Sequence, residues 1–277
     1  MKKTLLTICL VWMCFSLSAQ KIIDLSGKWS FSIDRQDNGE KEKWFSHTLN
    51  DFINLPGSMP EKLKGDEVTA KTQWTGSLYD SSYYYNPYME KYRKEGNIKF
   101  PFFLTPDKHY VGAAWYQKEV NIPADWKGER ILLFLERPHI ETTVWVNGQK
   151  TGMQNSLCVP HQYDITRYVR PGKCTITIRV DNRIKEINVG PDSHSITDQT
   201  QGNWNGIVGR ICLQTTPKTY FDDIQIYPEP EQKLARVKVV IKGTGTAKVK
   251  LSAESFNTDK KHIVPAIQQE IKLNKGV

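Results

Sequence analysis

Alternation of apolar and polar residues is the feature that most restricts what this chain can fold into. In the segment "GKWSFSID", Trp29, Phe31 and Ile33 alternate with lysine and serine residues, which is the pattern of a β-strand with one buried face. The segments "WYQKEVNIP" and "RILLFLE" continue the theme, and no stretch has a helical period except a weak one at residues 86–95. Short strands separated by turn signals predict an all-β protein with a jelly-roll sandwich.

Two later segments support the same prediction. In "CTITIRVDN", the residues expected to point inward are Ile176, Ile178 and Val180, and those expected to point outward are Thr175, Thr177 and Arg179. The segment "ETTVWVNGQKTG" places Asn147 and Gly148 directly after an alternating run. Because both residue types tolerate a positive φ, this pair predicts a tight β-hairpin turn.

Residues 1–19 have the layout of a secretory signal peptide. Two lysines precede an apolar run over residues 5–17, and Ser18 and Ala19 supply the small residues of a cleavage site before Gln20. The run is shorter than the roughly 20 residues of a transmembrane helix. We therefore expect export to the bacterial periplasm or the extracellular space, cleavage near Ala19, and no membrane partner.

The character of the sequence changes near residue 218. The segment "TTPKTYFDDIQIYPEP" is typical of a linker that enters a new strand at Ile224–Tyr227, and "ARVKVVIKG", "TAKVKLSAESF" and "AIQQEIKL" are typical of further strands. The sequence thus predicts a signal peptide (1–19), a jelly roll (20–218) and an immunoglobulin-like domain (219–277). The last segment is shorter than the roughly 100 residues of such a domain, so we expect it to be incomplete.

Composition and motifs argue against several other classes of protein. The formal charge is +8, but the lysines are scattered and form no basic stripe with interleaved aromatic residues, so nucleic acid is not an expected partner. No CxxC or HxxxH spacing occurs, so we expect no metal site, and nothing indicates a cofactor. Three cysteines, Cys158, Cys174 and Cys212, lie after the expected signal peptide. Cys174 and Cys212 lie in or beside predicted strands, so we expect their thiols to be buried.

Three ordered motifs carry a family resemblance. They are "WYQKEVNIPADWKGERILLFLERPHIETTVWVNGQKTG", "PHQYDIT" and "GNWNGIVGRICLQTTPKTYFDDIQIYP". In order and spacing they resemble the amino-terminal sugar-binding domain of glycoside hydrolase family two, which contains β-galactosidases, β-glucuronidases and β-mannosidases. The resemblance implies a jelly roll, then an immunoglobulin-like domain, and in the complete enzymes a catalytic (β/α)8 barrel.

The same resemblance implies a retaining mechanism with two glutamates, both of which lie on the barrel in the family. The acid/base glutamate follows an asparagine there, and no Asn-Glu pair occurs in these 277 residues. A barrel alone takes roughly 250 residues. We therefore nominate no catalytic residue and expect the chain to be inactive alone, as the amino-terminal part of an exported, β-galactosidase-like β-glycosidase. A separately encoded barrel domain would be its protein partner.

Sugar contact is best assigned to the polar segment "EINVGPDSHSITDQTQGNW" and the asparagine after it. Amides and carboxylates hydrogen-bond hydroxyl groups, and an aromatic ring covers the apolar face of a sugar. The candidate carbohydrate-binding residues are Asp198, Asn203, Trp204 and Asn205. Asp198 is the nearest match to an acidic residue that touches substrate in some β-galactosidases. The alternative, in which Trp204 packs under the sandwich rim within a solvated loop, stays open.

A second hypothesis for the whole chain is a free-standing carbohydrate-binding module without hydrolase activity. It predicts a closed second domain with a polar edge. The hydrolase-fragment hypothesis instead predicts apolar surface exposed on that domain.

Overall fold

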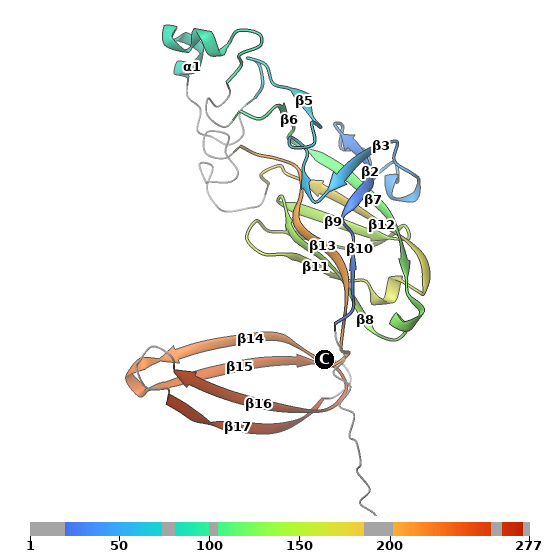
Figure 1. The fold of residues 1–277 in the computed structure, drawn as a ribbon, viewed down its shortest axis with the longest axis vertical. Coiled ribbons are helices and arrows are strands. Elements are labelled where there is room, and N and C mark those ends of the chain that lie inside the picture. The colour runs from blue at the N-terminus through green and yellow to red at the C-terminus, as the bar shows by residue number, and fades with distance from the viewer. Residues whose placement is uncertain (1–19, 74–80, 100–104, 186–201, 256–261, 274–277) are drawn as a thin grey trace, which may run out of the picture.

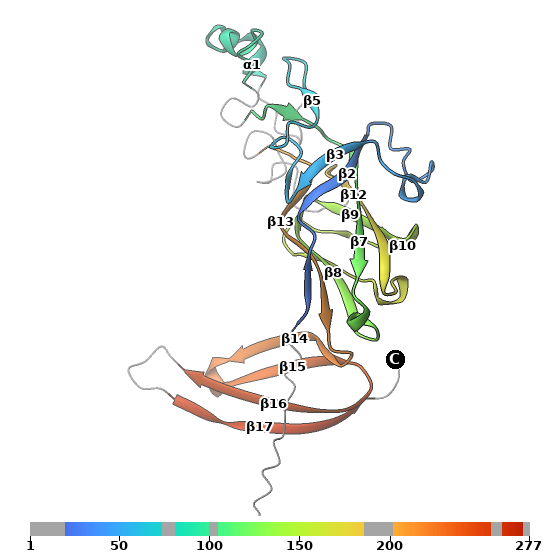
Figure 2. The same cartoon turned by 45° about the vertical axis from the view of Figure 1, so that its right-hand side comes forward.

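The chain folds into two facing β-sheets, followed by a smaller β region toward the carboxyl terminus (Figure 1, Figure 2). The computed structural model describes residues 20–73, 81–99, 105–185, 202–255 and 262–273. The expected signal peptide at 1–19 and the candidate residue Asp198 lie outside these ranges. The prediction of an all-β sandwich is confirmed by the strand order given below.

Each sheet of the sandwich is antiparallel in every pairing described. The five-stranded sheet has the order β1-β13-β8-β11, with β4 also paired to β13. Its strands are β1 (Ile22–Asp24), β4 (Gly57–Ser58), β8 (Arg130–Pro138), β11 (His161–Asp164) and β13 (Gly206–Thr216). The six-stranded sheet has the order β10-β9-β12-β7-β2-β3. Its strands are β2 (Gly27–Asp34), β3 (Asp51–Leu55), β7 (Ala113–Ile122), β9 (Glu141–Val146), β10 (Gln149–Asn155) and β12 (Gly172–Asp181).

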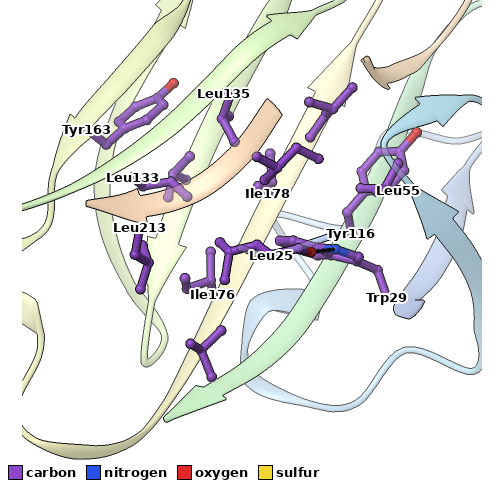
Figure 3. Close-up of a cluster of buried hydrophobic side chains, with 14 of the residues drawn as sticks. Leu25, Trp29, Leu55, Tyr116, Leu133, Leu135, Tyr163, Ile176, Ile178 and Leu213 are labelled. Atoms are coloured by element: carbon purple, nitrogen blue, oxygen red, sulfur yellow. Dashed lines mark hydrogen bonds between the residues drawn. The ribbon is translucent and has the colours of Figure 1, made fainter. Parts of the chain in front are cut away.

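The hydrophobic core lies between the two sheets. Figure 3 shows Leu133 and Leu135 of β8 in one cluster with Ile176 and Ile178 of β12. The isoleucines and Val180, all predicted to point inward, have no solvent-exposed surface, so that prediction is confirmed. Burying each such side chain stabilises the fold by about 1.5–3 kcal/mol.

The other face of β12 is covered as well, which the alternating pattern did not predict. Thr177 and Arg179 lie on that face, yet they are only 1% and 7% exposed. The chain between β2 and β3 folds over it, and its short 3-10 helix η1 (Trp44–Ser46) packs against the buried rings of Trp115 and Trp145. Thr177 and Arg179 thus point away from the core without being exposed, whereas Thr175 on the same face is half-exposed.

The predicted hairpin turn is confirmed. β9 ends at Val146, and β10 begins at Gln149 and pairs back with it. Asn147 and Gly148 between them have φ values of 50° and 76°, as the predicted turn requires.

An insertion between β4 and β7 extends one end of the sandwich, at the top of Figure 1. It contains the paired strands β5 (Asp66–Glu67) and β6 (Lys108–His109), the helix α1 (Ser82–Tyr85) and the 3-10 helix η2 (Pro87–Tyr92). The weak helical period at 86–95 thus corresponds to one short 3-10 helix.

Two β-hairpins lie at the end of the sandwich opposite α1 (Figure 1). They pair β14 (Tyr220–Glu229) with β15 (Leu234–Lys242), and β16 (Gly245–Ser255) with β17 (His262–Leu273). The remaining 3-10 helices are η3 (Ala124–Trp126), η4 (Thr166–Tyr168) and η5 (Pro230–Gln232). The predicted strand at Ile224–Tyr227 falls within β14, and Ile226 and Ile267 are exposed apolar residues of this region. The division at residue 218 and the incompleteness of the second domain stay predictions.

Arg130, at the start of β8, joins the sandwich to β14. Its Nε donates to Asp164 Oδ2 at 2.8 Å, and its Nη1 donates to Thr216 Oγ1 at 3.2 Å. Its guanidinium lies 3.8 Å from the ring centre of Tyr220. One side chain thereby contacts the end of β13 and the start of β14.

Candidate carbohydrate-binding site

Asn205, one of the predicted sugar-binding residues, is fully buried and holds three strands together. Its Nδ2 donates to the carbonyl oxygens of Gly112 and Val180 at 2.9 and 3.0 Å. Its Oδ1 accepts a 2.7 Å hydrogen bond from the hydroxyl of Tyr116, whose pKa burial raises well above its ordinary value. The amide therefore links the chain just before β13 to β7 and β12.

Asn203 is buried beside it and pairs with Asn182. Asn203 Nδ2 donates to the Asn182 carbonyl oxygen at 2.8 Å, and Asn182 Nδ2 donates to Asn203 Oδ1 at 2.9 Å. Asn182 also donates to the carbonyl oxygen of Tyr110 and accepts from the backbone N–H of Gly112, both at 2.8 Å. The two asparagines thus link the segment before residues 186–201 to the segment after them.

This network explains the order of residues in "GNWNG". Alternate residues of an extended segment point to opposite sides, so the inward asparagines place Trp204 on the other side. Gly206 follows with a φ of 140°, and a Cβ there would lie 2.5 Å from the carbonyl oxygen of Gly57. The geometry gives Asn203 and Asn205 framework positions, and their predicted contact with sugar stays a prediction.

Trp204 is half-buried, and its predicted contact with sugar stays a prediction. Its ring stacks on His139, with ring centres 4.3 Å apart and planes at 29°. It also lines an open pocket of about 380 Å³, together with Pro60, Pro106 and Val208 among others. That volume is near the lower end of small-molecule sites. An aromatic ring beside prolines and an amide backbone suits the apolar face of a sugar.

A cluster of ion pairs lies where β12 ends, next to Asn182. Asp181 has no exposed surface and pairs with Arg179 at 2.9 Å and with Lys185 at 2.7 Å. Burial by itself raises the pKa of the Asp181 carboxyl, but hydrogen bonds from Arg183 and Lys185 and the charge of Arg179 outweigh it and hold the pKa well below 3.8. Asp181 is therefore a carboxylate at any ordinary pH.

Two further carboxylates complete this ion cluster. Glu141 accepts from Arg179 at 3.2 Å and from Lys185 at 3.1 Å, and Asp37 pairs with Arg179 at 2.6 Å and with Arg183. Three cations thus face three carboxylates, so the cluster is neutral in sum. It fixes the point at which the chain leaves β12.

A second open pocket, of about 730 Å³, lies between this cluster and the insertion. Arg35, Asp66, Gln73 and Arg183 contribute side chains to it. None of these residues stands out in the sequence, because they form no local motif and only the fold brings them together.

Aromatic rings, amides and paired charges line these two open pockets. Within the described ranges, no group of three histidine, cysteine, aspartate or glutamate residues could hold a metal ion. No helix in that part of the chain is long and apolar enough to cross a membrane.

Comparison with known proteins decides the family. Residues 22–217 match the model described as "Glycosyl hydrolases family 2, sugar binding domain". The chain belongs to glycoside hydrolase family two. The resemblance carried by the three sequence motifs is thereby confirmed.

Several curated relatives of the chain are β-glucuronidases. The chain is 24% identical over 266 residues to β-glucuronidases of Pongo abelii and Homo sapiens, covering 86% of this chain and 35% of each relative. It is 25% identical over 222 residues to that of Paenibacillus borealis, covering 75% of this chain and 31% of the relative. The chain thus spans about a third of the length of these proteins. The expected likeness to β-galactosidases finds no support in them.

Solved structures show the same fold. An uncultured Clostridium β-glucuronidase has a TM-score of 0.56 and 19% identity, over 93% of this chain and 40% of its own. The Ruminococcus gnavus β-glucuronidase has a TM-score of 0.57 and 16% identity, over 93% and 39%.

Proposed function

We propose that this chain is the non-catalytic, sugar-binding part of an exported family-two glycosidase that acts on β-glucuronides. The observation that carries the proposal is the alignment with β-glucuronidases over 86% of the chain. The match covers 35% of the relative, and the described residues form sandwich sheets and hairpins. In this proposal a catalytic barrel supplies the two carboxylates, and this chain supplies a rigid surface that contacts the glycan.

The Trp204 pocket is the part of that surface we assign to the carbohydrate. The ring is held by His139 on one side, and the asparagines before and after it are fixed by hydrogen bonds to the backbone. A ring already held in place loses little conformational freedom when a ligand binds, which favours affinity. Asp198 stays a proposed contact on the sequence argument alone.

The test measures turnover and binding with the full chain. The probes are 4-nitrophenyl β-D-glucuronide and 4-nitrophenyl β-D-galactoside. We expect neither to be hydrolysed by the chain alone. We expect saturable binding of the glucuronide by calorimetry, weakened about tenfold in Trp204→Ala, which corresponds to roughly 1.4 kcal/mol.

Trp44→Ala is the matched control, since Trp44 is also half-buried and packs on another ring, Trp115, on the outer face of the six-stranded sheet. It should leave the affinity unchanged. Hydrolysis by the chain alone would overturn the non-catalytic role. Tighter binding of the galactoside, or equal binding by Trp204→Ala and wild type, would overturn the glucuronide and site assignments.

Export is tested separately, by expressing the chain with residues 1–19 in a bacterium and sequencing the amino terminus of the product. The proposal expects Gln20 as the first residue, in the periplasmic or culture fraction. A cytoplasmic product that keeps Met1 would contradict it.

A further inference from the structure

The 730 Å³ pocket between the insertion and the ion cluster has the size of a small-molecule site. Four segments of the chain build it: Arg35 directly after β2, residues 66–73 at and beyond β5, residues 109–111 at the end of β6 and after it, and Arg183 after β12. Convergence of polar side chains from several segments on one concave surface is typical of a binding site.

The charges that line this pocket are already paired within the protein. Arg35 forms an ion pair with Asp66, and Glu67 pairs with Lys108. Arg183 donates through Nε to Asp181 at 2.9 Å and through Nη2 to Asp181 and Asp37. Because each lining cation has a carboxylate partner, the pocket has little net field to attract a phosphate or a uronate.

Hydrogen-bonding capacity nevertheless remains. A guanidinium has five N–H groups, and within the described residues Arg35 donates only through Nη2, to Asp66. The Nη1 of Arg183 has no hydrogen bond within those ranges, and neither does the exposed side-chain amide of Gln73. Hydrogen-bonding groups therefore remain available at the pocket, and the guanidinium groups of Arg35 and Arg183 are held in place by carboxylate partners.

Apolar contact is available on one side. Val111 is a lining residue with 37% of its surface exposed, and Arg35 lies over the ring of Tyr110, 6.0 Å from its centre. A ligand that suits this wall has several hydroxyl groups, no net charge and a small apolar face.

We propose that this pocket binds a neutral saccharide, with Arg35, Asp66 and Gln73 hydrogen-bonding its hydroxyl groups and Val111 covering a C–H face. The site is separate from the Trp204 pocket and does not depend on it. Pre-paired arginine and carboxylate groups cost little to order when the sugar binds.

The test titrates the full chain with cellobiose and xylobiose, and with D-glucuronic acid and inorganic phosphate as anionic probes. Calorimetry and ligand-observed NMR report binding. Gln73→Ala and Arg35→Ala should each weaken binding of a neutral disaccharide by about tenfold. Both side chains are exposed, so the fold is expected to survive, and circular dichroism checks this.

Gln149→Ala is the matched control, because Gln149 is also an exposed glutamine and lies far from this pocket. It pairs with Val146 at one end of β9, whereas Asp181 pairs with Glu141 at the other end. It should bind like wild type, and so should Trp204→Ala, which separates this site from the proposed glucuronide contact. Affinity for a neutral sugar should also be nearly independent of salt.

Three outcomes would overturn the proposal. One is the absence of binding of both disaccharides by wild type. The second is unchanged affinity in both Gln73→Ala and Arg35→Ala. The third is tighter, salt-sensitive binding of glucuronic acid or phosphate that Arg35→Ala weakens and Trp204→Ala leaves unchanged, which would place an anion in this pocket. None of these bears on glucuronide binding at Trp204, so failure of one proposal is distinguishable from failure of the other.

Discussion

Replacing Asn205 with alanine should be one of the most costly polar substitutions in the sandwich. The change removes both donors and the acceptor of a side chain that has no exposed surface. Two backbone carbonyl oxygens, of Gly112 and Val180, and the hydroxyl of Tyr116 then lose a partner in the interior. Each buried polar group left without a partner costs about 1–3 kcal/mol.

A carbonyl oxygen has two lone pairs and tolerates the loss of one partner better than an N–H does, so the lower end of that range applies to the two carbonyls. We expect Asn205→Ala to lower the free energy of unfolding by about 3–5 kcal/mol, a large part of the 5–15 kcal/mol of a typical domain. Tyr116→Phe leaves one acceptor unpaired and should cost about 1–2 kcal/mol. In the double variant the two costs should not add, because the residues share a hydrogen bond.

Urea unfolding followed by tryptophan fluorescence measures this. No tryptophan lies beyond residue 204, so the carboxyl-terminal hairpins contain no tryptophan that would contribute to the signal. Asn54→Ala is the matched control, since Asn54 is an exposed asparagine of β3, and it should change stability by less than about 0.5 kcal/mol. A cost below about 1 kcal/mol for Asn205→Ala, or equal costs for Asn205→Ala and Asn54→Ala, would refute the role assigned to Asn205.

Glycine substitutions should separate a crowded position from an open one. Gly206→Ala, with its Cβ 2.5 Å from a β4 carbonyl oxygen at positive φ, should cost about 3 kcal/mol in urea unfolding. Gly148→Ala, which has open space around its Cβ, should cost only about 1–2 kcal/mol, and equal costs would contradict the argument. The folded pKa of Asp181 lies below its ordinary 3.8, so its ion pairs stabilise the fold above that pH and are lost as pH falls toward the depressed pKa. The urea midpoint of wild type should therefore decrease when the pH is lowered below about 4. Asp181→Asn is already destabilised by about 3–5 kcal/mol, so its urea midpoint should decrease less over the same pH range. Equal decreases in the two proteins would argue against the ion cluster. Iodoacetamide should label exposed Cys158 quickly and leave Cys174 unlabelled, because burial raises the pKa of the Cys174 thiol to about 11; mass spectrometry that finds early labelling of Cys174 would contradict its burial.

The local pattern predicted the inner face of the sandwich because alternation records which side of a strand is apolar. Ile176 and Ile178 are buried as expected. It could not predict burial of Thr177 and Arg179, because their cover comes from the segment between β2 and β3, more than a hundred residues away in the chain. The thiols of Cys174 and Cys212 are buried as predicted, since their strand contexts are local.

The candidate site shows a different limit of sequence reasoning. The polar residues around Trp204 indicated hydrogen bonding, but composition does not distinguish a sugar hydroxyl from a backbone carbonyl as the partner. Asn205 bonds to the carbonyls of Gly112 and Val180, which only the tertiary structure brings to it. The sequence did not predict the pocket lined by Arg35 and Gln73, because only the fold brings those two residues together.

The paired amides of Asn182 and Asn203 also bear on how this protein can change. They hydrogen-bond directly to each other, so this link does not use any residue of the segment between them. Doubling the length of a connection between fixed ends costs only about 0.6 kcal/mol of closure entropy. Evolution can therefore lengthen, shorten or rewrite the intervening stretch with little penalty to the sandwich. The same pair of asparagines makes the segment between residues 182 and 203 a suitable place to insert engineered recognition loops.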